Sequence, residues 1–415
     1  MQRVLYISPV LPRRDGRGLE RRAYRVIEAL SHRYRVSLLT TERAKQSGTA
    51  AADAMSMCDD VTVLPLRRWT ASALGRRALR RFLPERYYAS YDQPSDWLAP
   101  SRADQKRLAR MYLRDRFDLV HVHRLYMLPL LRSCPVLAKV PASIDLDDIE
   151  SITRDRLATL ARLNGDGRIA YVMQQDAEAY RAIERRELAR FERVFVCSGA
   201  DRARLLSGAG PRRVDVLPNV VEIPGEPLRR TRRTSGRSFV FLFVGTLDYY
   251  PNRDAVAFFC REVAPLIRAR VSRPFEIRIV EDSGPKRRRQ VPSIPEMSWA
   301  PRDADLGREY AAADAVIVPI RAGGGTRIKA LEAFAHRRAV VSTAIGVEGL
   351  DVEHGKHALI GQTAADLAVH AAAAMDDTAL RGRLAERAFA LVQTAYSPAV
   401  LRRRIDEVMG DSLCV

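Results

Sequence analysis

Residues 314–350 read DAVIVPIRAGGGTRIKALEAFAHRRAVVSTAIGVEGL, and this stretch decides the fold. A short apolar run at 315–319 is followed by a loop with three glycines, by a segment of helical length, and by a second apolar run at 339–343. Short apolar runs separated by helix-length segments are typical of strands in a parallel sheet. The stretch therefore predicts a strand, a loop, a helix and a second strand of an α/β domain.

The same alternation extends in both directions along the 415 residues. Apolar runs recur at 3–8, 36–40, 61–64, 117–123, 142–146, 193–198 and 214–219, and again at 239–245, 277–280, 315–319, 339–343 and 358–360. Between these two series, 224–237 combines prolines with an arginine-rich run, which is typical of an exposed linker. We predict two doubly wound α/β domains that face each other, 1–222 and 238–392, with a last helix at about 393–415 that rejoins the first domain.

Bulk composition supports a folded protein. Hydrophobic residues make up 47% of the chain and charged residues 29%, so each half can bury a core. The net charge of +19 attracts anions, although an arginine-rich composition would produce it without any function. The five scattered cysteines indicate neither a disulfide framework nor a zinc site, and no run of 18 apolar residues occurs. We expect a cytoplasmic protein, either free or at the inner face of the membrane.

The glycine loop of 321–329 has the chemistry of an anion site. Three consecutive glycines, Gly323, Gly324 and Gly325, leave backbone N–H groups unobstructed where a strand turns into a helix, and a helix N-terminus favours negative charge. Thr326 can cap the helix or bond a phosphate oxygen. We therefore expect a diphosphate to bind at this loop.

Charged residues around the glycines strengthen this expectation. Arg321, Arg327 and Lys329 bring cations to the loop and the first helical turn, where they oppose the helix dipole unless an anion binds. Glu332 lies one turn deeper and can accept hydrogen bonds from sugar or ribose hydroxyls. The alternative is a solvated Lys329–Glu332 pair on a surface helix.

Together with 339–350 and with 243–252, these residues resemble the donor-site segment of the family 4 (group 1) retaining glycosyltransferases. The resemblance implies the GT-B fold, in which two Rossmann-like domains face each other. It also implies transfer of a sugar from a nucleoside-diphosphate sugar to an acceptor hydroxyl with retention. The acceptor would be a glycan, a lipid-linked saccharide or a small-molecule aglycone. The nucleotide sugar is a co-substrate, and neither a cofactor nor a metal is implied.

By position, the resemblance places Glu332 against the donor ribose and Thr326, Arg327 and Lys329 against its phosphates. Two departures from the family pattern stand out. Gly324 occupies the place of the first signature glutamate, and Thr246 and Asn252, after the strand that ends in Gly245, replace an arginine and lysine pair. We interpret the chain as a variant in which basic groups of 321–329 neutralise the diphosphate and the amides of 323–325 meet the sugar hydroxyls.

The N-terminal domain offers candidates on two loops and at the end of one strand. Gly16, Arg17 and Gly18 follow the first strand, where the family's flexible loop touches donor and acceptor, and they fail as a dinucleotide fingerprint because Arg21 replaces the third glycine. Asp147 and Asp148 follow another strand and can stabilise an oxocarbenium-like state, or can simply cap a helix. The run Asp145-Leu146-Asp147 imitates a metal motif, but we predict no metal.

His123 closes the strand at 117–123, and we count it with Asp147 and Asp148 as a catalytic candidate, with a structural histidine as the alternative. The segment 66–83 combines arginines with Trp, Leu and Phe, so it can contact an anionic membrane or can pack as an ordinary basic helix. Two other functions are compatible with the sequence: a nucleotide-sugar epimerase or hydrolase of the same fold, and a nucleic-acid-binding protein. Charge alone suggests the latter, and no motif supports it, so we predict no nucleic-acid partner.

Overall fold

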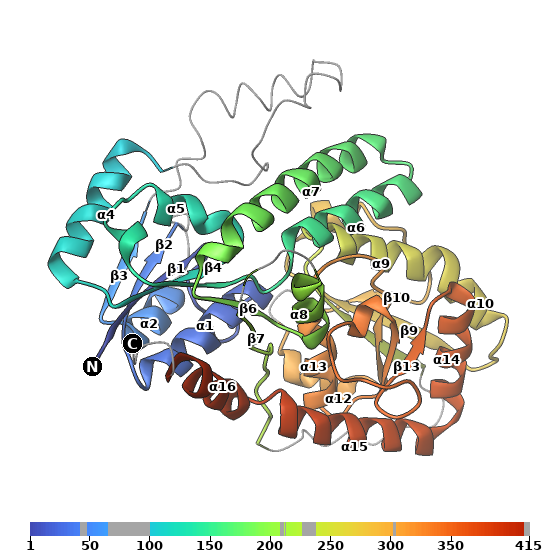
Figure 1. Cartoon of the computed structure of the whole chain (residues 1–415). Coiled ribbons are helices and arrows are strands. Elements are labelled where there is room, and N and C mark those ends of the chain that lie inside the picture. Colours follow the sequence, from blue (N-terminus) through green and yellow to red (C-terminus); the bar gives the residue numbers. More distant parts are fainter. Residues whose placement is uncertain are drawn as a thin grey trace. The chain divides into compact units, whose positions relative to one another are not determined.

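The computed structural model describes residues 1–41, 48–64, 100–207, 211, 213–225, 238–301 and 304–410. The chain divides into two compact units, Met1–Asn219 with Leu401–Val415, and Val220–Val400 (Figure 1). From the sequence we expected the second domain to cover 238–392. The segment 66–83 and most of the expected linker lie outside the described residues.

The first unit contains one parallel sheet in the order β3-β2-β1-β4-β5-β6-β7. The chain runs outward from β1 to β3 and then returns to the other side of β1, so this is a doubly wound sheet that reverses between β1 and β4. Its strands are β1 (Arg3–Ser8), β2 (Arg35–Thr40), β3 (Asp60–Val63), β4 (Leu119–His123), β5 (Ala142–Asp145), β6 (Arg193–Val196) and β7 (Val214–Val216).

Helices connect these strands. They are α1 (Gly18–Ser31), α2 (Gly48–Met57), α4 (Arg102–Asp115), α5 (Leu128–Arg132), α6 (Glu150–Leu163), α7 (Gly167–Glu187) and α8 (Gly199–Leu206), with short 3-10 turns η2 (Leu125–Met127), η3 (Leu137–Lys139) and η4 (Leu188–Arg190). The last helix, α16 (Pro398–Gly410), begins in the second unit and continues into the first.

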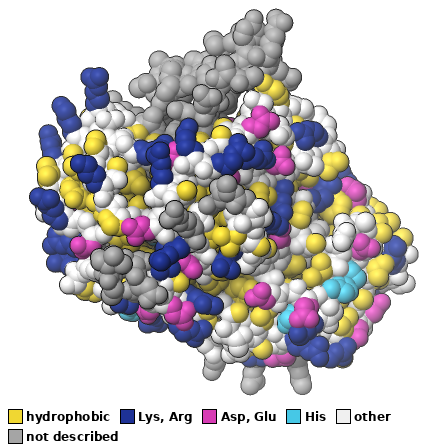
Figure 2. Space-filling view, viewed as in Figure 1, with side chains coloured by type: hydrophobic (Ala, Val, Ile, Leu, Met, Phe, Trp, Pro, Cys, Tyr) yellow, Lys and Arg dark blue, Asp and Glu magenta, His cyan; other side chains and the backbone are white. Residues whose placement is uncertain are grey.

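The two faces of this first sheet differ in chemistry because side chains alternate along a strand. Leu5, Ile7, Val120, Val122 and Ile144 belong to an apolar core that α4, α5 and α7 cover. The opposite face carries a buried polar layer, with Tyr6, His121, His123, Ser143 and Asp145. On the outside, lysine and arginine side chains gather along one edge of this unit (Figure 2).

The second unit repeats the same winding with six parallel strands in the order β10-β9-β8-β11-β12-β13. Its strands are β8 (Phe239–Val244), β9 (Phe275–Val280), β10 (Met297–Trp299), β11 (Ala315–Val318), β12 (Val340–Thr343) and β13 (Leu359–Gly361). The helices are α9 (Tyr250–Phe258), the π-helical turn η5 (Phe259–Val263), α10 (Ala264–Arg268), α11 (Pro285–Arg288), α12 (Leu306–Ala312), α13 (Ile328–Ala335), the 3-10 turn η6 (Ile345–Val347), α14 (Ala364–Asp376) and α15 (Thr378–Ala395).

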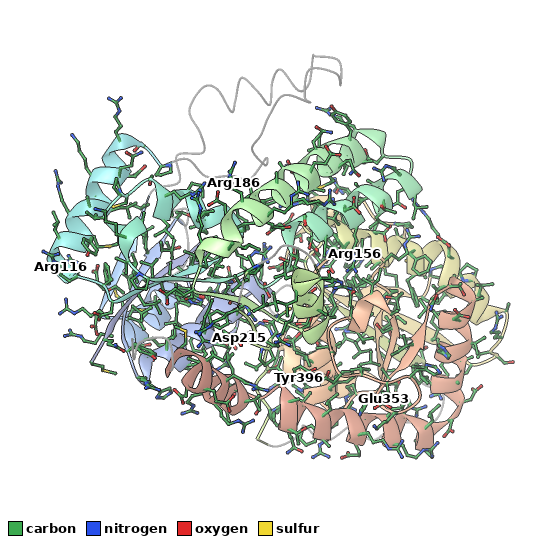
Figure 3. The ribbon with its side chains drawn as sticks, in the orientation of Figure 1. Arg116, Arg156, Arg186, Asp215, Glu353 and Tyr396 are labelled. Atoms are coloured by element: carbon green, nitrogen blue, oxygen red, sulfur yellow. The ribbon has the colours of Figure 1, made fainter. Side chains whose placement is uncertain are left out.

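The core of the second unit forms around β8, whose residues Phe239, Phe241 and Phe243 are fully buried. Near the end of α15, Tyr396 packs on this core, and its hydroxyl accepts a hydrogen bond from the backbone N–H of Asp351 at 2.8 Å (Figure 3). The predicted fold class is confirmed: there are two α/β units with parallel, doubly wound sheets. Of these strands, β10 was not expected from the sequence.

Candidate functional site

The carboxyl ends of β8, β11 and β12 define the candidate donor site in the second unit. The sheet reverses between β8 and β11, and in such sheets ligands bind beyond the carboxyl ends of the strands at this point. Ser342 at the end of β12 donates to the carbonyl of Val318 at 3.1 Å, and Thr343 donates to the carbonyl of Ile320. These bonds brace the start of the glycine loop against the neighbouring strand.

Gly245, Asn252 and Lys329 meet at the end of β8. The Nζ of Lys329 donates to Oδ1 of Asn252 at 2.7 Å, and Nδ2 of Asn252 donates to the carbonyl of Thr246 at 2.8 Å. A Cβ on Gly245 would lie 2.7 Å from Asn252 Nδ2 and 2.8 Å from Lys329 Nζ, so only glycine allows this close approach. Burial and the nearby Arg327 lower the pKa of Lys329 to about 7.

Arg327 lies under the glycine loop and keeps two donor atoms unused. Its NH1 donates to the carbonyls of Gly324 and Gly325, the latter at 3.1 Å. Its Nε and NH2 are buried and have no hydrogen-bond partner within the described ranges of the chain. Gly323 has φ 138°, and a Cβ there would lie 2.9 Å from this NH2 and 3.1 Å from the hydroxyl of Tyr249. A buried guanidinium with unused donors beside bare backbone is an arrangement that suits an anion.

Arg321 and Thr326, also expected at the donor site, have other roles in the structure than the sequence suggested. Arg321 makes a bidentate ion pair with Asp254, at 2.9 and 2.6 Å, and its guanidinium lies 4.6 Å from the centre of the Phe258 ring. It therefore ties the loop to α9. The helix α13 takes Arg327 as its N-cap, so Thr326 precedes the cap position and does not cap this helix as the sequence suggested.

Glu332 is only 8% exposed, so it is not part of a solvated surface pair. The hydroxyl of Tyr310 donates to its Oε2 at 3.3 Å, and the Tyr310 ring stacks on His336 at a centroid distance of 4.6 Å. Thr246, near the end of β8, shares a hydrogen bond of 2.7 Å with the hydroxyl of Ser283.

In the first unit, the corresponding edge carries carboxylates that are already paired. Arg22, on α1, binds Asp145 through two hydrogen bonds of 2.8 and 2.7 Å and donates to Oδ1 of Asn219 at 2.9 Å. Burial alone would raise the pKa of Asp145, but Arg22 outweighs it and lowers that pKa to about 2. This pair therefore stays ionised inside the protein.

Asp147 and Asp148 follow on the loop between β5 and α6. Asp147 has φ 60°, and its Oδ1 accepts a bond of 3.1 Å from Asn219 while its Oδ2 lies 3.4 Å from Arg124. Burial raises the pKa of Asp147. Asp148 pairs with Arg124 and accepts from Thr153 at 3.1 Å, so it anchors the start of α6.

His123 is fully buried in the polar layer of the first sheet, and neither ring nitrogen has a hydrogen-bond partner among the residues described. Burial lowers its pKa to about 3, so it is neutral at neutral pH. Its ring lies 6.0 Å from that of Tyr6 on β1.

The expected acceptor loop forms a tight turn before α1. The N–H of Arg17 donates to Oε2 of Glu20 at 2.7 Å, and Arg17 is the N-cap of α1, which begins at Gly18. A Cβ on Gly16 would lie 2.7 Å from the Cβ of Glu20, so the turn needs a glycine there. Since α1 also carries Arg22, one helix connects this loop to the Asp145 pair.

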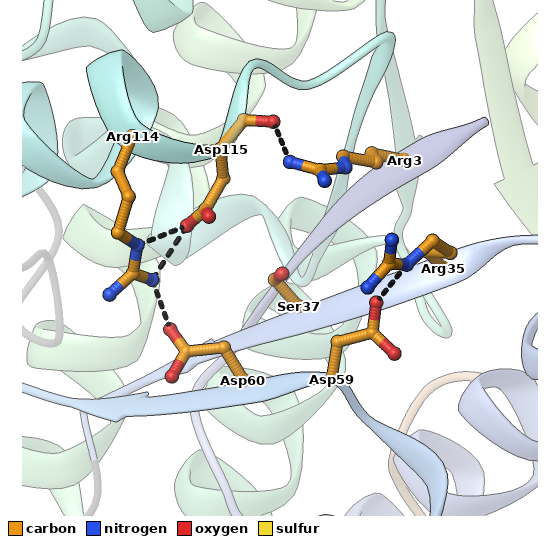
Figure 4. A pocket seen from close by; sticks show the side chains of 7 residues that line it. All are labelled: Arg3, Arg35, Ser37, Asp59, Asp60, Arg114 and Asp115. Carbon is orange, nitrogen blue, oxygen red and sulfur yellow. Dashed lines mark hydrogen bonds and ion pairs between the residues drawn. The ribbon is translucent and has the colours of Figure 1, made fainter. Parts of the chain in front are cut away.

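A small hollow of about 260 Å³ lies at the opposite, amino-terminal edge of the first sheet (Figure 4). Its charged groups pair with one another: Arg35 with Asp59 at 2.5 Å, and Arg114 with Asp60 at 2.9 Å. The charges balance, and the hollow lies away from the strand ends where ligands of such sheets bind.

Several residues of these sites escaped the sequence analysis: Arg22, Arg124, Asn219, Tyr249 and Ser283. Arg22 had a usable signal, because it lies in phase with the buried face of α1 beside Ala23 and Val26. Arg124 directly follows β4, at the edge where ligands bind. The other three gave no local signal.

Each of the two units has a doubly wound parallel sheet, and this pair of units defines the class. The chain has the GT-B fold of two Rossmann-like domains. The fold also resembles solved structures of that class. Sucrose-phosphate synthase from Thermosynechococcus elongatus is 15% identical with a TM-score of 0.70, covering 99% of both chains. A glycosyltransferase from Rickettsia africae is 13% identical with a TM-score of 0.66, covering 100% of this chain and 99% of that one. HepE of Anabaena, solved with UDP and glucose, is 16% identical with a TM-score of 0.66, covering 99% of this chain and 100% of that one.

Two family models match in sequence. A glycosyl transferase 4-like domain matches residues 17–220, and the group 1 glycosyl transferases match residues 238–377. No match was found among curated proteins. The chain therefore belongs to the group 1, family 4-like glycosyltransferases, and it is a glycosyltransferase.

Proposed function

We propose that the second unit holds a nucleoside-diphosphate sugar and that the chain transfers the sugar, with retention, to an acceptor hydroxyl bound by the first unit. One observation carries the donor assignment: beside the glycine loop, at the reversal point of the sheet, Arg327 has two buried donor atoms without a partner among the residues that the structure describes. The structures of HepE with UDP and with UDP-glucose are compatible with such a donor.

The diphosphate is assigned to the backbone of 323–325, to Arg327 and to Lys329. Its charge grows as the bond to the sugar breaks, and fixed cations and N–H groups stabilise that charge without reorganising. These groups supply the positive charge that the leaving diphosphate needs, and we propose that the reaction uses no cofactor. Glu332 is assigned to a hydroxyl of the ribose, because a buried carboxylate is an acceptor for such a group.

The sugar itself is assigned to the loop amides, since Gly324 occupies the place of a carboxylate. In the first unit, Asp147 is the stronger candidate for the reacting centre: Asn219 fixes its carboxylate, its contact with Arg124 is a long one of 3.4 Å, and burial raises its pKa. Asp148 is instead held by its close pair with Arg124 and by Thr153. The acceptor is a glycan, a lipid-linked saccharide or a small-molecule aglycone.

Calorimetry of the purified chain with UDP, GDP, ADP and TDP tests the donor site. We expect one of these nucleotides to bind, and the Glu332→Ala variant to lose affinity for it while Arg308→Gln, at an 83% exposed side chain, binds as the unaltered chain does. Absence of binding by all four would overturn the proposal.

Product analysis separates transfer from the other reaction of this fold. A transferase forms a glycosylated product only when the acceptor is present, whereas an epimerase or a hydrolase converts the nucleotide sugar alone. A screen of nucleotide sugars for thermal stabilisation names the donor, because a bound ligand raises apparent stability by mass action.

The place of action is also part of the proposal. In the described ranges, no helix is long and apolar enough to cross a membrane. Contact of 66–83 with the inner face of a membrane stays a prediction, since that segment lies outside the described residues.

A further inference from the structure

The helix α4 presents a face that is basic and free of acids. Arg102, Lys106, Arg107, Arg110 and Arg114 are all exposed, and a helix of 3.6 residues per turn places them within one arc of less than half its circumference. Leu113, 61% exposed, lies within the same arc, between Arg102 and Lys106 around the helix. On the opposite side, Leu108 and Met111 are buried against the core of the first unit.

The two acids of α4 lie outside this arc and are occupied. Asp104 accepts hydrogen bonds from the N–H and the hydroxyl of Ser101, at 2.9 and 2.6 Å, and so fixes the start of the helix. Asp115, with Asp60 on β3, pairs with Arg114 and holds the end of the helix to the sheet (Figure 4). The helix is therefore fixed at both ends.

The remaining cations of the face have no such neutralisation. Arg102, Lys106 and Arg110 make no ion pair within the part of the chain that the structure describes. In Figure 2 the lysine and arginine side chains along this edge project outward, and Figure 3 shows Arg116, just after α4, doing the same.

Another arginine-rich helix of this chain shows that composition alone does not produce such a face. In α16, Arg403 and Arg404 both pair with Glu407, at 3.8 and 3.1 Å, and Asp406 is exposed beside them. Its exposed charges are therefore mixed in sign, as on an ordinary solvated helix. In α4 the exposed charges are of one sign.

We propose that this face of α4, defined by Arg102, Lys106, Arg107, Arg110 and Leu113, docks on the surface of an anionic phospholipid bilayer. A row of four to eight basic residues on an amphipathic helix suits an anionic lipid surface, and Leu113 can enter the interface between the headgroups. The face carries no aromatic side chain on which a nucleic-acid base could stack, so the chemistry favours lipid over single-stranded nucleic acid.

The proposal goes beyond glycosyl transfer and does not depend on it. It predicts attachment that weakens as salt is raised, because screening acts on exposed charges. It also places the first unit, rather than the second, against the lipid.

Vesicle sedimentation tests it with the full chain. Vesicles contain equal parts of phosphatidylglycerol and phosphatidylcholine, or phosphatidylcholine alone. We expect the unaltered chain to bind only the anionic vesicles. The R102Q/K106Q/R110Q variant should lose about 100-fold in affinity, since each cation near such a surface contributes about fivefold. The matched control R402Q/R403Q/R404Q removes the same charge from α16 and should bind within about threefold of the unaltered chain.

Three results would overturn the proposal: no binding of the unaltered chain to anionic vesicles, equal losses in the two triple variants, or binding to phosphatidylcholine alone that equals binding to the anionic mixture. Circular dichroism of both variants checks the fold, and nucleotide binding by calorimetry checks the second unit. A tighter, equally salt-sensitive binding of the same face to duplex DNA, lost in the α4 variant, would also count against a lipid partner.

Discussion

The two units have sheets of the same winding but opposite chemistry at their carboxyl edges. In the first unit, Arg22 pairs with Asp145, and Arg124 pairs with carboxylates that follow Asp145 in the chain. In the second unit, Nε and NH2 of Arg327 have no hydrogen-bond partner among the described residues, and Lys329 donates to the amide oxygen of Asn252. The two units thus have similar folds, but the arginines at the carboxyl edge of the first sheet are paired with carboxylates, whereas Arg327 and Lys329 at the edge of the second sheet can still accept an anion.

This difference indicates which unit takes the charged substrate. A preformed edge whose cations Arg327 and Lys329 make no ion pair within the described ranges favours a diphosphate. An edge whose carboxylates are already paired with arginines suits hydroxyl groups, which bring no charge. Fold alone would not distinguish the two units, because ligands bind at the same edge in both.

The largest expected effect is on the stability of the first unit, at the Arg22–Asp145 pair. Arg22→Gln leaves Asp145 buried without its partner and should lower the free energy of unfolding by about 3–5 kcal/mol. Urea unfolding followed by circular dichroism measures this. Arg35→Gln is the control, because its pair with Asp59 is half-exposed and such pairs contribute about 1 kcal/mol or less. A loss no larger than that of the control would remove the distinction between the edges.

Arg327→Gln should act in the opposite way. It should weaken binding of the nucleoside diphosphate by about 10- to 150-fold, since hydrogen bonds to charged groups contribute about 1.5–3 kcal/mol. Stability of the free chain should change by about 1 kcal/mol or less, because the bonds lost from NH1 to the carbonyls of Gly324 and Gly325 are offset by removal of the buried donors that have no partner. Calorimetry and urea unfolding of the same variant give both numbers. If stability fell and affinity did not, Arg327 would be a structural residue like Arg22.

Gly323→Ala tests whether nucleotide binding needs a glycine loop without side chains. The new Cβ would displace Arg327 NH2 and strain a residue at φ 138°, so we expect about a tenfold loss of nucleotide affinity. Gly382→Ala on α15 is a matched control, since nothing lies within 4 Å of a Cβ there. The control should bind nucleotide normally and be slightly more stable, as expected for alanine in a helix.

The smallest effect concerns pH. Lys329, with its pKa lowered to about 7 by burial and by Arg327, loses its charge as pH rises through this value, so affinity for the diphosphate should fall severalfold between about pH 6.5 and 8.5. The same group should make the free chain more stable from pH 7 toward 10.5, because the unfolded lysine then binds more protons. Lys329→Arg should flatten both profiles. Parallel profiles in the two proteins would contradict the assignment.

The fold was predictable because each strand of these sheets is a short apolar run. Residues 239–245, for example, form a short apolar run that ends in glycine, as expected of a buried parallel strand, and the structure has β8 at Phe239–Val244. The strand β10 was not predicted because Met297–Trp299 has only three residues, all partly exposed, and so gives no apolar run in the sequence. The glycine loop was recognisable because its chemistry is local.

The partners of charged side chains were not predictable. The pairing of Arg321 with Asp254 joins residues 67 positions apart, and that of Arg22 with Asp145 joins residues 123 apart. No periodicity encodes such contacts, so Arg321 looked like Arg327 in the sequence. The N-cap of α13 also shifted to Arg327, which shows how a helix start depends on the loop that precedes it.

The contact between Lys329 and Asn252 also bears on how such enzymes are compared. The family pattern often has a lysine soon after the first strand of this domain, where this chain has Asn252, yet the ammonium of Lys329 reaches the same corner from α13. A residue 77 positions further along the chain therefore supplies a positive charge beside Asn252. Relatives that seem to lack an essential cation should therefore be judged by where their side chains end rather than by where they begin.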